Sequence, residues 1–195
     1  SYQASVEVVS ILLKNWPAAV RKKDKIGMTP LHNACEFEAS FGVVSLLMDT
    51  YPAACREHDG HERTPLHSAC WNNAPEQVLK LLLEEYPNAV TKSDVFMGTL
   101  EEYDFENQAV GKLVSHVYRL VCGISNQDVK DIMIYFMNVE WWGGVAIVVD
   151  FYPAVVGLVG VDDECFPYLL SRVKGCKLCT MWQLISNRQD LLASL

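Results

Sequence analysis

The chain has 195 residues, of which 50% are apolar and 21% are charged, as is typical of a folded protein. Its 24 acidic and 16 basic side chains give a formal net charge of −8. A nucleic-acid-binding protein would present a basic face, whereas the basic run at residues 21–25 is short. The composition therefore argues against a nucleic-acid partner, and the length allows one compact domain or one short array of repeats.

Cysteine usage and hydropathy indicate the compartment. The seven cysteines are odd in number and follow no regular framework, which favours free thiols in a reducing environment. The most apolar stretch, residues 145–161, is interrupted by Asp150 and Pro153 and is too short between them to span a bilayer. We expect an intracellular, cytoplasmic protein that does not insert into a membrane.

The first predicted elements come from a phrase that returns after 35 residues. Residues 29–35 and 64–70 both begin Thr-Pro-Leu-His and agree at six of seven positions. A second phrase, an aromatic residue followed by Pro-x-Ala, stands at residues 16–19, 51–54 and 86–89. A fixed period of this size is typical of a stacked-repeat protein.

Each copy predicts a helical hairpin. Thr29 and Thr64 are suited to cap short helices over residues 30–37 and 65–72, with a proline at the first helical position. Second helices follow with one apolar face, and the Tyr-Pro pairs at 51–52 and 86–87 end them, because proline disfavours helical geometry in the preceding residue.

These phrases resemble the ankyrin repeat family over about residues 6–94. The family period is about 33 residues, and here it is 35, with one extra residue in the loop between helices and one at the aromatic-Pro-x-Ala ending. The resemblance implies an all-α solenoid of about five hairpin units, some degenerate. It also implies a non-enzymatic protein-protein interaction module, monomeric, that uses hairpin tips and a concave face of inner helices.

Beyond residue 98 the pattern fades. Thr99 keeps the phase, helices are expected over residues 110–121 and 129–138, and the aromatic-proline pair returns at Tyr152. We assign a single solenoid with units at 1–28 (truncated), 29–63 and 64–98 (clear), 99–130 and 131–165 (degenerate), and 166–195 (closing, around Phe166 and Trp182).

Candidate chemical sites are few. In ankyrin repeats a histidine at the position of His32 and His67 braces the hairpin, so we do not expect it to be catalytic. The C-x-x-C of Cys176 and Cys179 lacks further zinc ligands nearby, and residues 58–61 are better explained as a solvated hairpin tip. We expect no cofactor, no metal and no catalytic residue.

The resemblance does suggest residues that would bind a partner protein. They lie at hairpin tips and at the ends of the first helices, and they are Lys25, Ile26, Met28, Glu36, Phe37, His61, Glu62, Arg63, Trp71, Asn72, Phe96 and Met97. Trp71 could equally pack on the neighbouring unit. The repeated aromatics Trp16, Tyr51, Tyr86 and Tyr152 are expected to pack between units.

Two alternatives stay open. The chain could be the repeat portion of a larger protein that carries a catalytic or membrane segment, since the first helix of the first unit is missing and should leave apolar surface uncovered near Val9 and Leu12. It could also be a small metal-binding or enzymatic protein that uses residues 99–195.

Overall fold

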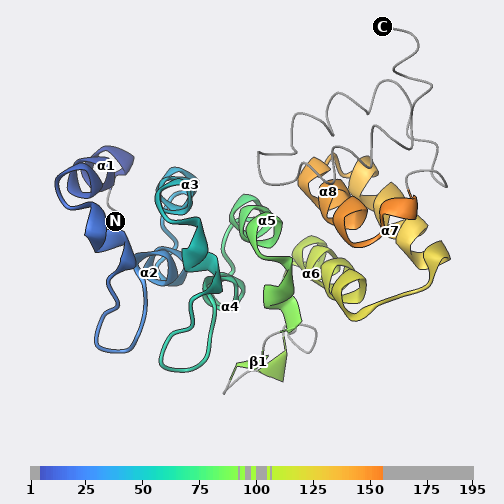
Figure 1. Ribbon diagram of the computed structural model, residues 1–195, viewed down its shortest axis with the longest axis horizontal. Helices are drawn as coiled ribbons and strands as arrows, with labels where there is room; N and C mark the ends of the chain where they lie inside the picture. The colour runs from blue at the N-terminus through green and yellow to red at the C-terminus, as the bar shows by residue number, and fades with distance from the viewer. Residues whose placement is uncertain (1–4, 92, 95–97, 100–104, 106, 156–195) are drawn as a thin grey trace, which may run out of the picture. The chain divides into compact units, whose positions relative to one another are not determined.

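The computed structural model describes residues 5–91, 93–94, 98–99, 105 and 107–155. These residues form eight α-helices and one very short strand pair, so the expected all-α fold is confirmed (Figure 1). The chain divides inside helix α6 (Gln108–Cys122) into two compact units, Ser1–Tyr118 and Arg119–Leu195.

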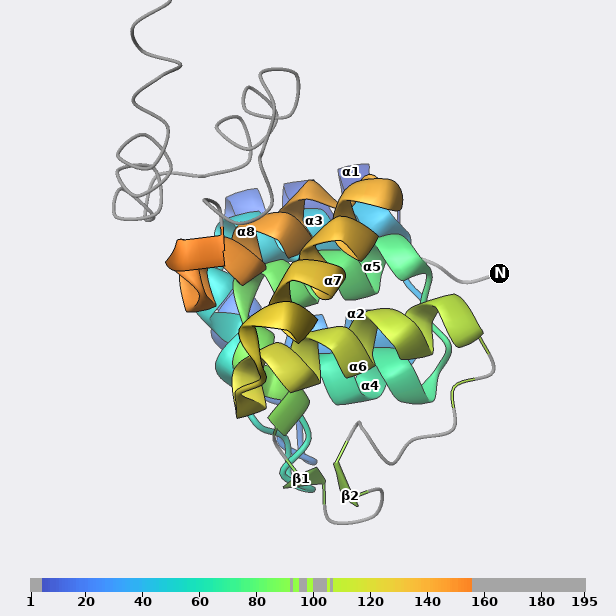
Figure 2. The ribbon, with the colours of Figure 1, turned by 90° about the vertical axis from the view of Figure 1, so that its right-hand side faces the viewer.

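Helical hairpins build the first unit. The inner helices α2 and α4 lie side by side, and each packs against the outer helix that follows it, α3 or α5 (Figures 1 and 2). Each outer helix, α1 included, runs into a 3-10 segment. The elements are α1 (Val6–Asn15), η1 (Pro17–Arg21), α2 (Pro30–Glu36), α3 (Phe41–Thr50), η2 (Pro52–Arg56), α4 (Pro65–Trp71), α5 (Glu76–Glu85) and η3 (Pro87–Thr91).

The inner helices begin where the threonine caps predict. Thr29 has extended backbone angles, and its hydroxyl accepts the backbone N–H of His32 at 3.4 Å. Pro30 occupies the first helical turn, where its missing N–H removes no hydrogen bond. The same capping box is present at Thr64. Local sequence therefore sets the start of both helices.

Small apolar side chains fill the interface between inner and outer helices. Ala34, Cys35, Ala69 and Cys70 are at most 8% exposed, which lets the helix backbones approach closely. Leucines and valines from α3 and α5 complete this core: Val43, Val44, Leu47, Val78, Leu79 and Leu82. The buried cysteines carry free thiols and serve as small apolar residues.

A left-handed residue turns the chain from each inner helix into its outer helix. Glu38 has φ 52° and Asn73 has φ 49°, and in both loops the next backbone N–H returns to the helix, Ala39 to Ala34 and Ala74 to Ala69, each at 2.9 Å. This is the Schellman arrangement that ends many helices.

The third hairpin tip contains the strand pair. In it β1 (Ser93–Asp94) pairs antiparallel with β2 (Gly98–Thr99), with Ser93 opposite Thr99. Two residues per strand leave the fold class unchanged. The predicted binding residues Phe96 and Met97 at this tip lie outside the described residues.

In the second unit, α7 (Asn126–Asn138) packs on α8 (Trp142–Phe151), which runs into η4 (Pro153–Val155). Their loop repeats the turn of the first unit, with φ 53° at Glu140 and a 2.9 Å bond from Trp141 N–H to the Phe136 carbonyl. Tyr152 ends α8 with φ −136° and ψ 67°, close to the −145° and 79° of Tyr51.

The helices expected over residues 110–121 and 129–138 are confirmed as α6 and α7. Helix α7 runs across the predicted unit boundary at residue 130. The expected closing unit, including Phe166 and Trp182, lies outside the described residues, so the division into one solenoid of six segments stays a prediction.

Candidate functional site

An aspartate organises each of the first two hairpin tips. Oδ1 of Asp24 accepts the N–H groups of Ile26 and Met28, both at 2.9 Å. Oδ1 of Asp59 accepts those of His61 at 2.8 Å and Arg63 at 3.0 Å. The repeated aspartates are therefore turn-forming residues. No cluster of three metal-ligating side chains occurs in the part of the chain that the structure describes.

Asp59 also holds the guanidinium of Arg63. Its Oδ2 accepts Nε at 2.9 Å and lies 2.8 Å from Nη2. Burial alone would raise the pKa of this carboxyl, but the amides of His61 and Arg63 and the Arg63 guanidinium lower the pKa below its usual range. Nη1 of Arg63 turns toward Glu36 of the preceding repeat, 3.8 Å from Oε2.

The two repeated histidines brace the hairpins. In His32, Nδ1 accepts the Thr29 backbone N–H at 3.3 Å and lies 2.8 Å from its hydroxyl. Nε2 lies 3.0 Å from the Arg63 carbonyl, which can only accept, so this nitrogen carries the proton. Burial lowers the pKa of His32 and keeps it neutral. His67 makes the same contact with Thr64, at 2.9 Å. The predicted bracing role is confirmed.

Backbone and charged groups join the first two tips. Gly60 N–H donates to the Ile26 carbonyl at 2.8 Å, and a Cβ on Gly60 would lie only 2.8 Å from that oxygen. Lys23 Nζ donates to the His58 carbonyl at 2.9 Å and pairs with Glu57 at 2.8 Å. Successive repeats are therefore fixed in register at their tips.

The aromatic residues that end the outer helices also join repeats. The Arg21 guanidinium lies 4.9 Å from the centre of the Tyr51 ring, and Arg56 lies 5.6 Å from that of Tyr86. Each arginine belongs to the repeat before its tyrosine, as the expectation of packing between units requires for Tyr51 and Tyr86. Trp16 departs from that expectation, because it is 59% exposed. In the second unit the Tyr152 hydroxyl instead closes the end of α6, donating to the Leu120 carbonyl at 3.0 Å.

The predicted partner-binding residues differ in how far they are exposed to solvent. Lys25, Ile26, Phe37, Glu62 and Trp71 are exposed, and Glu36, His61, Arg63 and Asn72 are half-buried. The prediction that Met28 contacts a partner is wrong. It is only 3% exposed, because the Asp24 carboxylate holds its amide within the turn while its side chain joins the core. Met28 therefore cannot contact a partner in this structure.

Two large aromatic side chains project at the same ends of neighbouring helices. Phe37 caps the C-terminus of α2 and is 71% exposed, and Trp71 closes α4 and is 45% exposed. Since α2 packs against α4, both belong to one side of the inner-helix layer. Trp71 is thus partly covered and partly accessible within the described residues.

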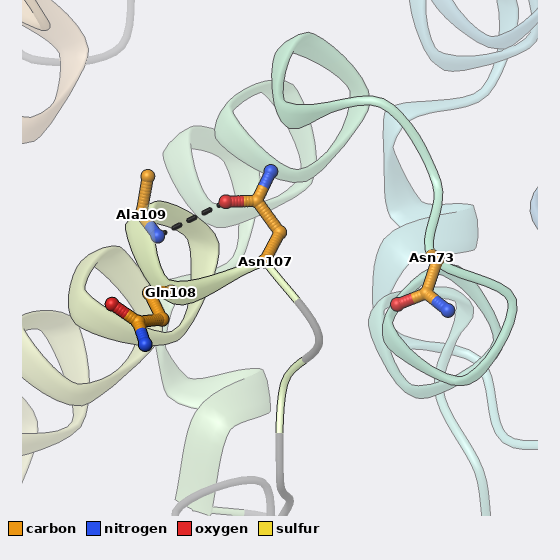
Figure 3. Close-up of a pocket in the computed structure, with 4 residues that line it drawn as sticks. All are labelled: Asn73, Asn107, Gln108 and Ala109. Atoms are coloured by element: carbon orange, nitrogen blue, oxygen red, sulfur yellow. Dashed lines mark hydrogen bonds between the residues drawn. The ribbon is translucent and has the colours of Figure 1, made fainter.

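A hollow of about 510 Å³ adds residues that the sequence did not single out. It is lined by Asn73, Asn107, Gln108 and Ala109, between the loop after α4 and the start of α6 (Figure 3). Asn107 Oδ1 accepts the Ala109 N–H at 3.0 Å and caps α6, while Asn73 is the left-handed turn residue. Amides in irregular loops carry no periodic signal, so sequence reasoning had no means to find them.

Helix α1 presents apolar surface, as expected near Val9 and Leu12. Leu12 is 60% exposed, whereas its counterpart Leu47 in α3 is 4% exposed. Val9 itself is half-buried. The difference arises because α3 is covered by inner helix α2, and the described residues include no inner helix for α1.

Other candidate chemistry receives no support from the described residues. Burial raises the pKa of the Cys35 and Cys70 thiols and raises the pKa of Cys55 to about 12, so these three are unreactive. The C-x-x-C of Cys176 and Cys179 lies outside the described residues. No described helix has both the length and the apolar character needed to cross a membrane.

Comparison with known proteins identifies the repeats. Residues 1–93 match the family model for ankyrin repeats, in three copies. A search of the curated proteins and a search of the solved structures each found no protein that matches. The matched range contains both capped hairpins, their bracing histidines and the stacked arginine and tyrosine pairs, and residues 1–93 of this chain are ankyrin repeats.

Proposed function

We propose that the chain is a non-enzymatic module that binds another protein through the hairpin tips and the C-terminal ends of its inner helices. Ankyrin repeats are generally protein-interaction modules, which supports the class of function. The observation that supports the location is the exposure of Phe37 and Trp71, 71% and 45%, on neighbouring helices. Large aromatic side chains of this kind anchor protein interfaces.

Preorganisation supports the same proposal. The bonds from Gly60 to Ile26 and from His32 to Arg63 fix the first two tips before any partner arrives. Little conformational entropy is then lost when the surface is occupied, so more of the contact energy appears as affinity. His32 has both ring nitrogens engaged in this framework, which leaves it unsuited to catalysis.

We also propose the oligomeric state and the cellular compartment from these features. We take residues 1–195 as one monomeric solenoid in a reducing, intracellular compartment. The buried free thiols of Cys35, Cys55 and Cys70 support that compartment, and the repeated turn at Glu140 supports a repeat unit beyond residue 93. Sedimentation of the intact chain tests the monomer, since a concentration-dependent increase in mass would contradict it.

The test of the binding surface compares matched variants. Proteins are captured on immobilised intact chain, on Phe37→Ala/Trp71→Ala, and on the control Trp16→Ala, which also removes an exposed tryptophan. Each captured protein is then produced pure and titrated against all three. We expect a direct partner to lose at least tenfold in affinity only with the double variant. Equal affinities for all three would refute this surface.

A further inference from the structure

The inner-helix ends carry acidic and aromatic side chains. We define this end surface as Glu36, Phe37, Glu38, Trp71 and Asn72, at the C-termini of α2 and α4 and in the loop after each helix. It combines two carboxylates with two exposed aromatic rings. Neither residues 30–55 nor residues 64–79 contain a lysine or an arginine. The end surface is therefore aromatic and acidic.

Arg63 does not fully neutralise Glu36. Arg63 directs Nε and Nη2 to Asp59 Oδ2, at 2.9 and 2.8 Å, and its side chain is only 12% exposed. Its Nη1 lies 3.8 Å from Glu36 Oε2, beyond hydrogen-bond distance, and this buried oxygen has no hydrogen-bond partner within the described residues. One guanidinium thus faces two carboxylates, and the triad keeps a net charge of −1.

Glu36 remains accessible to a ligand on its other side. Its side chain is 25% exposed, and it stands one residue before Phe37 and at the repeat position equivalent to Trp71. The last carbonyls of α2 and α4 add partial negative charge at the same ends. A cation placed here would meet a carboxylate and the faces of aromatic rings together.

We propose that the end surface binds a peptide segment of another protein that presents an arginine beside an apolar side chain. The guanidinium pairs with Glu36 and stacks on Trp71 or Phe37, and the apolar neighbour covers the remaining ring surface. Arginine fits better than lysine because its planar group can stack and donate several hydrogen bonds at once. This inference rests on the proposed function and specifies the chemistry of its partner.

A random 12-residue peptide library displayed on phage provides the probe. It is selected on the intact chain after depletion on Phe37→Ala/Trp71→Ala, so that the retained peptides depend on the aromatic rings. We expect arginine next to a leucine, isoleucine, valine or aromatic residue to dominate the retained sequences. Retained peptides without a basic residue would overturn the charge proposal while leaving the binding surface intact.

Binding constants of one retained peptide then isolate the charge. Glu36→Gln keeps the side-chain shape and should weaken binding about tenfold, as loss of a charge-assisted hydrogen bond predicts. Asp49→Asn, an exposed carboxylate on outer helix α3, is the matched control and should change binding less than about twofold. Replacing the peptide arginine with glutamine tests the same bond without altering the protein.

Negative results distinguish the proposed arginine contact from the proposed binding surface. Equal binding to the intact chain and to Glu36→Gln refutes the arginine contact alone, because the peptides still require Phe37 and Trp71. If depletion on the double variant removes every binding phage, no peptide depends on the rings, and the proposed surface fails together with its chemistry. Circular dichroism of each variant must match that of the intact chain for either conclusion to hold.

Discussion

Replacing Asp59 with alanine gives the most direct test of the hairpin-tip framework. Its side chain is fully buried and accepts two backbone N–H groups and the Arg63 guanidinium, at 2.8 to 3.0 Å. Hydrogen bonds to a charged group each contribute about 1.5–3 kcal/mol, and neighbouring ones are not additive. We expect the free energy of unfolding to fall by about 3 kcal/mol.

The assay is urea denaturation followed by tryptophan fluorescence and circular dichroism. In a thermal melt of a chain of this size, a loss of about 3 kcal/mol corresponds to a fall in Tm of roughly 6–12 °C. Asp59→Asn should lose less, because its amide oxygen can still accept the two N–H groups. Asp24→Ala is the counterpart in an exposed tip, where the carboxylate accepts two backbone amides and the Asn33 side-chain amide but no arginine.

The order of stability among the three variants shows whether burial and the Arg63 contact stabilise the tip. The reasoning requires Asp59→Ala to be the least stable, followed by Asp59→Asn, with Asp24→Ala closest to the intact chain. If Asp59→Ala and Asp24→Ala lose equal stability, burial and the Arg63 contact contribute nothing, and the tip is held by local turn geometry alone.

Three further predictions concern the repeats and the second unit. Gly60→Ala should cost about 1–3 kcal/mol, because its Cβ would meet a carbonyl oxygen at 2.8 Å, and more than Gly123→Ala, where φ is +92° but nothing lies within 4 Å of the added atom; thermal melts of both compare them. His32 has a lowered folded-state pKa, so its contribution to stability is complete above the unfolded value near 6.5 and declines as pH falls through that value toward the folded pKa; urea midpoints from pH 8 to 5 should show this slope, and His32→Gln should reduce it. Tyr152→Phe removes the bond to the Leu120 carbonyl and the bond accepted from the Ile124 N–H, and it should cost about 1–2 kcal/mol in chemical denaturation; an unchanged stability would contradict a role of this hydroxyl in holding the end of α6.

Local signals in the sequence were sufficient for most of the helical framework. The capping threonine and the following proline set the start of α2 at Pro30, and the Tyr-Pro pair set the end of α3 before Tyr51. Both signals act within a few residues through backbone geometry. The aromatic-proline phrase at Tyr152 likewise marked a hairpin in the second unit, although Thr-Pro-Leu-His is absent there.

Contacts between repeats could not be predicted in the same way. Arg63 occupies the position of Met28 in the preceding repeat, and no pattern distinguishes a buried methionine from an arginine that reaches Glu36. The turn residues Glu38 and Glu140 have positive φ values, a conformation that glycine adopts most readily, so a glutamate gives no sign of it in the sequence. These features depend on which side chains meet after the hairpins stack.

The candidate surface, too, could be predicted only in part from the sequence. Its residues were taken from positions that ankyrin repeats use, and exposure then separated Phe37 and Trp71 from Met28. The sequence could not decide whether Trp71 packs on its neighbour, because that depends on helix spacing. Nor did it indicate the hollow at Asn73 and Asn107, whose lining comes from the loop after α4 and from the start of α6, far apart in the chain.

The bonds that join the first two repeats have a mechanical consequence. The bonds from Gly60 to Ile26 and from Lys23 to His58 lie at the tips, next to the N-termini of the inner helices. At the opposite ends, the 3.8 Å approach of Arg63 to Glu36 spans the same two repeats. These tip bonds hold the two hairpins at a fixed spacing, so any change in their spacing at the tips would have to break hydrogen bonds to backbone carbonyls.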